Sequence, residues 1–162
     1  MAFKRSVSIS SPIFKYITIL FYSVVFVIQS CKSEKRIYES ECDNNITFQH
    51  IGFTKLIDSI ENYDQKYIEV EGTYQEGKEE SALVNDSLFV DHSSRHALWI
   101  NFSQDCPLYL IGTHKGIFEY SDGQFTQIKN KKVRIRGRID VRHKGHLGSY
   151  RGTIDRVSFV EL

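Results

Sequence analysis

Eleven residues near the carboxyl end hold the densest group of side chains that could bind a ligand. Residues 142–152 contain two imidazoles, three cations, a tyrosine and three glycines. Arginine, lysine and tyrosine donate hydrogen bonds to phosphate, carboxylate or sugar oxygens, and glycines let backbone amides approach a ligand closely. The candidate ligand-binding residues here are Arg142, His143, Lys144, His146, Tyr150 and Arg151. The alternative is a solvated hairpin loop whose glycines serve only its turn.

His143 and His146 also have the spacing of a metal-binding pair. A metal needs at least a third ligand, and a catalytic metal needs an open position as well. No HExxH, paired CxxC or carboxylate-rich segment accompanies the two histidines, and the chain has no GxSxG elbow or glycine-rich phosphate loop. We therefore predict no metal, no catalytic residues and no cofactor, with His143 and His146 as the only metal candidates.

Trp99 is the only tryptophan, and it lies in an alternating segment at residues 97–102. If Leu98 and Ile100 face the interior, the alternation of a strand turns Trp99 outward. An outward indole on this strand could stack a base or a sugar ring. In the alternative, the amino-terminal helix or an insert hairpin covers the indole, because exposed indoles are uncommon.

The elements that must position these residues are mainly strands. Apolar side chains at helical spacing in residues 53–60 predict one short amphipathic helix. Strict alternation in residues 67–74 and 132–139 predicts two half-buried strands, and each carries a glycine, Gly72 and Gly137, where a strand of a small barrel can bend. Shorter segments at residues 81–84, 97–102 and 152–162 complete a set of five strands.

The long connection before the fourth strand contains Asp122-Gly123 between alternating residues, which predicts a hairpin over residues 117–128. A helix beginning at Pro107 is the alternative there. Five strands with glycine bends in the first and fourth, after a helix, resemble the OB-fold, a partly open Greek-key barrel. The segments YIEVEGTY, LWINF and KKVRIRGRID are similar to the small OB-fold proteins of the bacterial periplasm. The resemblance implies that residues 142–152 join the last two strands, where OB-folds commonly bind ligands; a β-sandwich is the alternative fold.

Residues 129–156 carry ten cations and two acids, a stripe that by itself is typical of phosphate binding. In an OB-fold the first and fourth strands are antiparallel neighbours, so Glu69 and Glu71 should lie beside the arginines of the fourth strand. Those arginines are Arg134, Arg136 and Arg138. Cross-strand pairs would neutralise the stripe and fix the register of the strands.

Residues 1–30 have the three parts of a secretory signal: a basic amino end, an apolar core and a small residue before the cleavage point. Ile28-Gln29-Ser30-Cys31 resembles the bacterial lipobox. The resemblance implies that a lipid is attached to Cys31, that residues 1–30 are removed and that the new amino end is acylated. The alternative is an uncleaved transmembrane anchor. The apolar core is shorter than the roughly 20 residues that a membrane span needs, which favours the cleaved signal.

The resemblance to a lipobox implies a protein of the bacterial envelope. Lys32 stands where an aspartate would signal retention in the inner membrane, so we expect an outer-membrane lipoprotein that is periplasmic or surface-exposed. Loss of Lys4, Arg5 and Lys15 with the signal takes the 21 basic residues to 18, against 20 acidic residues. That balance does not favour a nucleic-acid partner.

Cys42 and Cys106 remain as an even pair in an oxidising compartment. They form either a disulfide or two free thiols. Residues 31–46 are mostly polar and are predicted to be a tether, with the barrel domain at residues 47–162.

Three functional hypotheses follow. The first is a non-enzymatic binding or interaction module for a glycan, a peptide or a partner envelope protein. The second is a metal-dependent or other hydrolase that uses His143 and His146. The third is a structural component of the envelope.

Overall fold

The computed structural model describes residues 35–89, 93–120 and 126–162. The predicted signal with Cys31 and the predicted Asp122-Gly123 turn lie outside these residues. Within the described ranges, no helix has the length and apolar character needed to cross a membrane.

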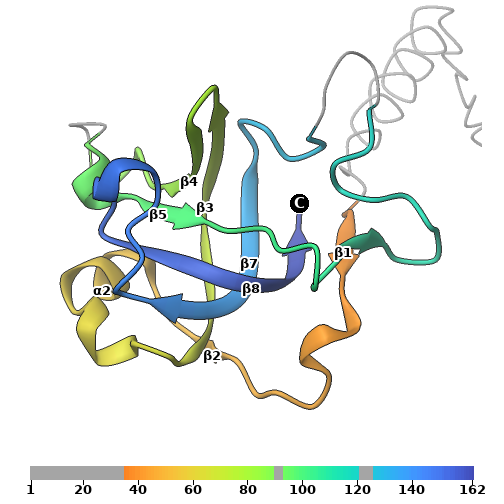
Figure 1. Cartoon of the computed structure of the whole chain (residues 1–162), viewed down its shortest axis with the longest axis horizontal. Helices are drawn as coiled ribbons and strands as arrows, with labels where there is room; N and C mark the ends of the chain where they lie inside the picture. Colours follow the sequence, from red (N-terminus) through yellow and green to blue (C-terminus); the bar gives the residue numbers. More distant parts are fainter. Residues whose placement is uncertain (1–34, 90–92, 121–125) are drawn as a thin grey trace, which may run out of the picture. The chain divides into compact units, whose positions relative to one another are not determined.

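Five strands close into a small barrel (Figure 1). They are β3 (Tyr67–Gly77), β4 (Glu80–Val84), β5 (Leu98–Ile100), β7 (Lys132–Asp140) and β8 (Gly152–Glu161). β3 pairs antiparallel with β4 and β7, β4 with β5, and β7 with β8, while the parallel pairing of β5 with β8 closes the circuit. This is the OB-like barrel that the sequence predicts, and the β-sandwich alternative is wrong.

The barrel interior is filled by the predicted alternating side chains. Ile68 and Val70 of β3 are fully buried, as are their counterparts on the other strands: Leu98, Ile100, Ile135 and Ile139. The predicted helix forms as α2 (Phe53–Asp58), followed by a 3-10 helix, η2 (Ile60–Tyr63), and its apolar face is buried. A short strand, β2 (Gln49–His50), precedes α2 and pairs parallel with β3.

Gly72 and Gly137 lie where neighbouring strands approach closely. A Cβ at Gly137 would lie 2.6 Å from Ile154 Cγ2 and 2.7 Å from the Asp155 carbonyl oxygen. The register of β7 against β8 shifts at this point, between Arg136 and Arg138. A Cβ at Gly72 would likewise lie 2.8 Å from the Val84 carbonyl oxygen. Both glycines therefore permit the close strand contacts of a narrow barrel.

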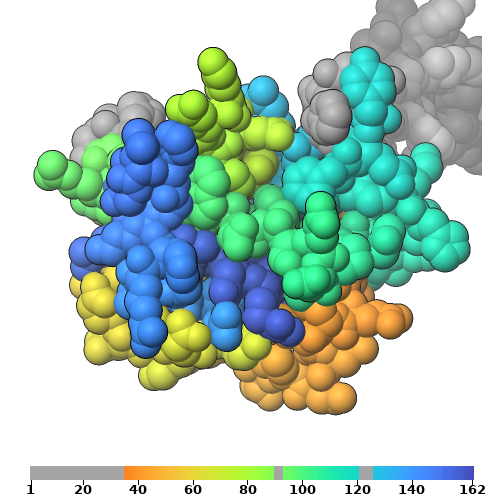
Figure 2. Space-filling model, viewed as in Figure 1, coloured from red at the N-terminus to blue at the C-terminus, as the bar shows by residue number. Residues whose placement is uncertain are grey.

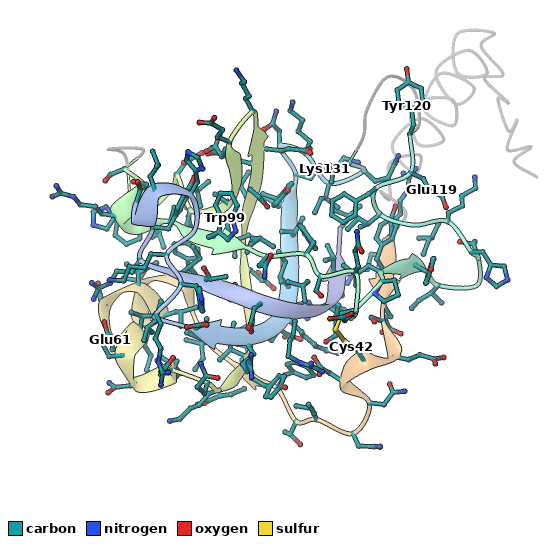
Figure 3. The ribbon with its side chains drawn as sticks, in the orientation of Figure 1. Cys42, Glu61, Trp99, Glu119, Tyr120 and Lys131 are labelled. Atoms are coloured by element: carbon teal, nitrogen blue, oxygen red, sulfur yellow. A yellow bond between two sulfur atoms is a disulfide. The ribbon has the colours of Figure 1, made fainter. Side chains whose placement is uncertain are left out.

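The segment predicted to be a tether belongs to the domain from Lys35 onward, so the predicted boundary at residue 47 is wrong. β1 (Ile37–Glu39) pairs antiparallel with the end of β8, and Tyr38 is only 3% exposed. A 3-10 helix, η1 (Glu41–Asp43), follows. Cys42 in η1 forms a disulfide with Cys106, so the bridged alternative is the one that the structure contains (Figure 3).

The insert between β5 and β7 extends the sheet rather than forming a helix. Its strand β6 (Tyr109–Leu110) pairs antiparallel with β1, so the helix considered at Pro107 does not form. The turn of the hairpin predicted over residues 117–128 lies outside the described residues. Its described flanks, residues 117–120 and 126–128, form no strand, although the Gln127 amide donates a hydrogen bond to the Ile117 carbonyl oxygen at 3.2 Å. α2 and the β7–β8 loop lie at one end of the domain, and β1 with β6 lies at the other (Figure 1).

Candidate functional site

The β7–β8 loop, residues 141–151, is held by a carboxylate at the end of β7. Asp140 is 8% exposed and accepts hydrogen bonds from the backbone amides of Arg142 at 2.8 Å and His143 at 3.3 Å. The His143 Nδ1 atom donates to the other oxygen of Asp140 at 2.6 Å. Burial by itself raises the pKa of Asp140, but these three hydrogen bonds outweigh burial and hold the pKa below its usual value. Asp140 therefore remains ionised and fixes the first turn of the loop.

The middle of the loop packs on Trp99. Gly145 has a φ of +63°, and a Cβ there would lie 2.6 Å from the indole ring. The Tyr150 ring meets the indole edge to face, with the ring centroids 5.2 Å apart. Trp99 points outward from β5 as predicted, and in the described part of the chain the β7–β8 loop, which is neither of the two predicted covers, lies against the indole (Figure 3). The loop and the strand face, which the sequence presents as separate candidates, are one surface.

The two loop histidines have different carboxylate partners. His143 contacts Asp140, whereas His146 Nε2 lies 3.2 Å from Glu79 Oε2 in the β3–β4 turn. Figure 2 shows this loop in blue beside the yellow-green β3–β4 hairpin. In the part of the chain that the structure describes, no group of three or more His, Cys, Asp or Glu side chains could hold a metal. The His143/His146 pair thus has no third ligand among the described residues.

A basic pocket of about 440 Å³ opens beside the loop. Three segments line it: the end of α2, the 3-10 helix η3 (Ser94–His96) and the β7–β8 loop. Its charged lining consists of Arg95, Lys144, Arg151 and the single acid Asp58, with His96 and Tyr150 as further polar groups. Three permanent cations against one carboxylate give the lining a net positive charge, which is the balance that an anionic group would require.

Arg151 is a structural part of the pocket wall. Its Nε atom donates to the Ile57 carbonyl oxygen at 3.1 Å, and its backbone amide donates to the Ala97 carbonyl oxygen at 3.1 Å. These bonds join the loop to the end of α2 and to the start of β5. The guanidinium is therefore held at a defined place, as a bidentate anion contact requires.

The predicted loop residues thus separate into two groups. Lys144, Tyr150 and Arg151 line the basic pocket, whereas Arg142, His143 and His146 do not. The sequence did not indicate Arg95 and His96. The sequence feature that could have indicated them is the segment Ser93-Ser94-Arg95-His96, which has a helix-capping serine. The Ser93 hydroxyl caps η3 by accepting a hydrogen bond from the Arg95 amide at 3.2 Å. Only the parallel pairing of β5 with β8 brings this turn beside the loop.

The arginine stripe on β7 is neutralised, as the sequence predicts. Glu69 lies opposite Arg136 in the β3–β7 register, and Glu71 lies opposite Arg134. Arg136 Nε donates to Glu69 at 2.6 Å. Two acids of β8, which the sequence did not indicate, pair with the remaining arginines: Glu161 with Arg134 and Asp155 with Arg138. The charges of these three arginines are therefore balanced by neighbouring carboxylates.

We predict that Glu69→Gln lowers the free energy of unfolding by about 1 to 2 kcal/mol, because Glu69 is 12% exposed and accepts a charged hydrogen bond. Burial raises the pKa of Glu69, but the hydrogen bond and charge of Arg136, with His50 and Arg134, lower it overall. A lowered pKa stabilises the fold above the unfolded-state value of about 4.3, and this contribution is lost as pH falls further.

Thermal unfolding between neutral pH and about pH 3 tests this prediction. The wild type should lose more stability on acidification than the Glu69→Gln variant. An additional Arg136→Gln change should lower the free energy of unfolding less in that variant than in the wild type. Glu71→Gln is the matched control, because this carboxylate is exposed on the same strand. Additive effects of the Glu69 and Arg136 changes would contradict the pairing.

The chain matches no protein-family model, no curated protein and no solved structure. What the structure does show is the class of protein that the fold defines. It is a small, mainly β domain built on a closed five-stranded OB-like barrel, to which β1, β2 and β6 add three further strands.

Proposed function

We propose that this protein is a lipid-anchored lipoprotein of the bacterial outer membrane whose barrel binds, without catalysis, the anionic group of an envelope glycan. The observation that carries this proposal is the basic pocket, where Arg95, Lys144 and Arg151 from two separate segments face one cavity. A phosphate or carboxylate on a sugar offers acceptors for these donors, and Tyr150 adds an aromatic wall next to Trp99.

We predict that replacing Arg95 and Lys144 with serine abolishes binding of acidic glycans and leaves the melting temperature nearly unchanged. Both side chains are exposed, and solvated surface cations contribute little to folding. Arg151 is left in place because its contact with Ile57 is structural. Binding of the mature protein to an array of neutral, carboxylated and phosphorylated glycans, followed by calorimetry on the best acidic binder, measures the effect.

A matched control removes the same charge elsewhere. Arg142 and Lys129 are exposed cations outside the pocket, and replacing both with serine should preserve binding. Equal losses in the two double variants would mean that net charge, not the pocket, governs binding. Tight binding of neutral glycans that survives the Arg95 and Lys144 changes would contradict the proposal.

The lipid anchor is tested separately. We predict that Cys31→Ser gives an unlipidated chain that leaves the membrane fraction, because only the thiol of Cys31 can accept the lipid. Fractionation with mass measurement of the amino-terminal peptide reads the outcome. A variant that still sediments with membranes and carries the same lipid would refute the anchor.

One observation favours the hydrolase as a second candidate. Asp140 orients the imidazole of His143, whose side chain is 81% exposed, as a carboxylate orients a general base. Among the described residues, however, no hydroxyl or thiol side chain forms a hydrogen bond with that imidazole. The arrangement lacks the nucleophile that a covalent mechanism needs.

A further inference from the structure

Most of the large apolar side chains that the described residues expose gather on the insert. Four of the six are Tyr109, Ile111, Phe118 and Tyr120, with exposed fractions of 46%, 53%, 42% and 72%. We call these four residues the insert patch. Beside it runs a groove of about 490 Å³ that is lined mainly by apolar side chains, among them Phe102, Leu108 and Ile117. Exposed apolar surface gathered in one region marks a contact surface.

The insert patch lies where the chain enters the domain. β6 pairs with β1, and the Ile111 amide donates to the Ile37 carbonyl oxygen at 2.9 Å. The Cys42–Cys106 disulfide fastens the start of the insert to the same amino-terminal segment. The insert lies at the opposite end of the domain from α2 and the β7–β8 loop, which line the basic pocket (Figure 1; Tyr120 and Trp99 are labelled in Figure 3).

The chain between the lipid and the domain is short. Cys31 and Lys35 are separated by four peptide steps, which span at most about 14 Å when fully extended. The headgroup layer on each side of a bilayer takes up about 5 to 7 Å of that reach. A lipid on Cys31 would therefore hold the β1 end of the barrel against the membrane surface.

The insert patch has the chemistry of that surface. Tyrosine is enriched at membrane–water interfaces because its ring enters the apolar boundary while its hydroxyl remains hydrated, and phenylalanine and isoleucine gain by leaving water. We infer that the insert patch docks on the bilayer beside the lipidated Cys31, so that the basic pocket is presented away from the membrane. This inference depends on the anchor in the proposed function, not on the glycan.

Fluorescence quenching in vesicles tests the docking. The mature lipidated chain, carrying Trp99→Phe and Ile111→Trp, is reconstituted into phosphatidylethanolamine and phosphatidylglycerol vesicles with brominated acyl chains. We expect the introduced indole to shift to shorter wavelength and to lose fluorescence relative to vesicles without bromine. The matched control is Leu147→Trp in the same background, because Leu147 is 86% exposed at the far end of the domain. Its indole should show neither change.

Each other outcome overturns the inference in a distinguishable way. An unquenched indole from Ile111→Trp on a chain whose acylation is verified by mass would refute the docking and leave the anchor intact. Equal quenching of both indoles would show that no face is preferred. A concentration-dependent shift without quenching would identify a second copy of the chain as the occupant. An unmodified Cys31 would refute the anchor and this inference together, while glycan binding is measured independently.

A second measurement needs no substitution in the domain. Amide hydrogen exchange of the lipidated wild type in unbrominated vesicles is compared with that of the soluble Cys31→Ser chain. Docking predicts slower exchange in residues 107–120 and unchanged exchange in residues 141–151. Unchanged exchange in residues 107–120 would overturn the inference even if the tryptophan variants fail to fold.

Discussion

Replacing Cys42 and Cys106 together with alanine is expected to lower the free energy of unfolding by about 4 kcal/mol in the chain-entropy model. The disulfide joins residues 64 positions apart, so its loss increases the conformational entropy of the unfolded chain. Urea unfolding of the mature protein measures the change. Reduction of the wild type with dithiothreitol should cause a similar loss, and equal midpoints in all three samples would contradict the prediction.

The location of the loss is also specific. The disulfide joins η1 to the insert, whereas the five barrel strands close through their own pairings. Hydrogen exchange in residues 107–120 should therefore become faster, while binding at the basic pocket should persist in the oxidised and reduced forms below the unfolding transition. A loss of glycan binding on reduction would show that the two ends of the domain are coupled.

Local patterns were sufficient to predict the barrel. Ile68 and Val70 alternate with Glu69 and Glu71. A two-residue alternation of apolar and polar side chains is enough to predict a strand with one buried face. Gly72 and Gly137 could be predicted as the positions where strands approach closely, because each interrupts an alternating segment with a residue that has no side chain. The pairing of Glu69 with Arg136 followed from the expected order of the strands.

Non-local pairings account for what the sequence did not predict. Residues 35–46 look like a tether because Ile37 and Tyr38 are their only large apolar residues before Ile46, and Tyr38 is buried only through pairing with β8 and β6. Arg95 belongs to a polar turn far from the loop in sequence, and only the closure of the barrel brings the two together. The carboxylates of β8 that pair with Arg134 and Arg138 could not be predicted either, because their pairing also depends on contacts between distant segments.

Residues 35–46 contain a buried carboxylate, Asp43, whose only charged partner among the described residues is Arg156. The Asp43 side chain is 1% exposed and lies 2.8 Å from Arg156 Nη2. Arg156 also donates to the Cys42 carbonyl oxygen at 3.2 Å, so one guanidinium holds η1 against β8. The hydrogen bonds and charge of Asp43 raise the pKa of Arg156. The other oxygen of Asp43 accepts no hydrogen bond from any described residue, which makes the carboxylate depend on this arginine.

We predict that Arg156→Met lowers the free energy of unfolding by about 3 kcal/mol, because it leaves a buried charge without its partner. The value is at the low end of the range for such pairs, since the Arg156 side chain is 39% exposed and water can partly replace it. Methionine keeps most of the apolar stem of arginine. Arginine and methionine have the same backbone strain at the positive φ of 46° found at this position. The comparison therefore isolates the effect of the charge.

A double-mutant cycle separates the pair from the packing around it. Asp43→Asn removes the charge that Arg156 neutralises, so the double variant Asp43→Asn with Arg156→Met should be more stable than the sum of the single changes predicts. Arg142→Met is the matched control, because its exposed side chain lies outside η1 and the pocket, and it should change stability by less than about 0.5 kcal/mol. Additivity across the cycle would contradict the pair. If the cycle shows coupling, η1 is fixed to β8 of the barrel by this ion pair and to the insert by the disulfide.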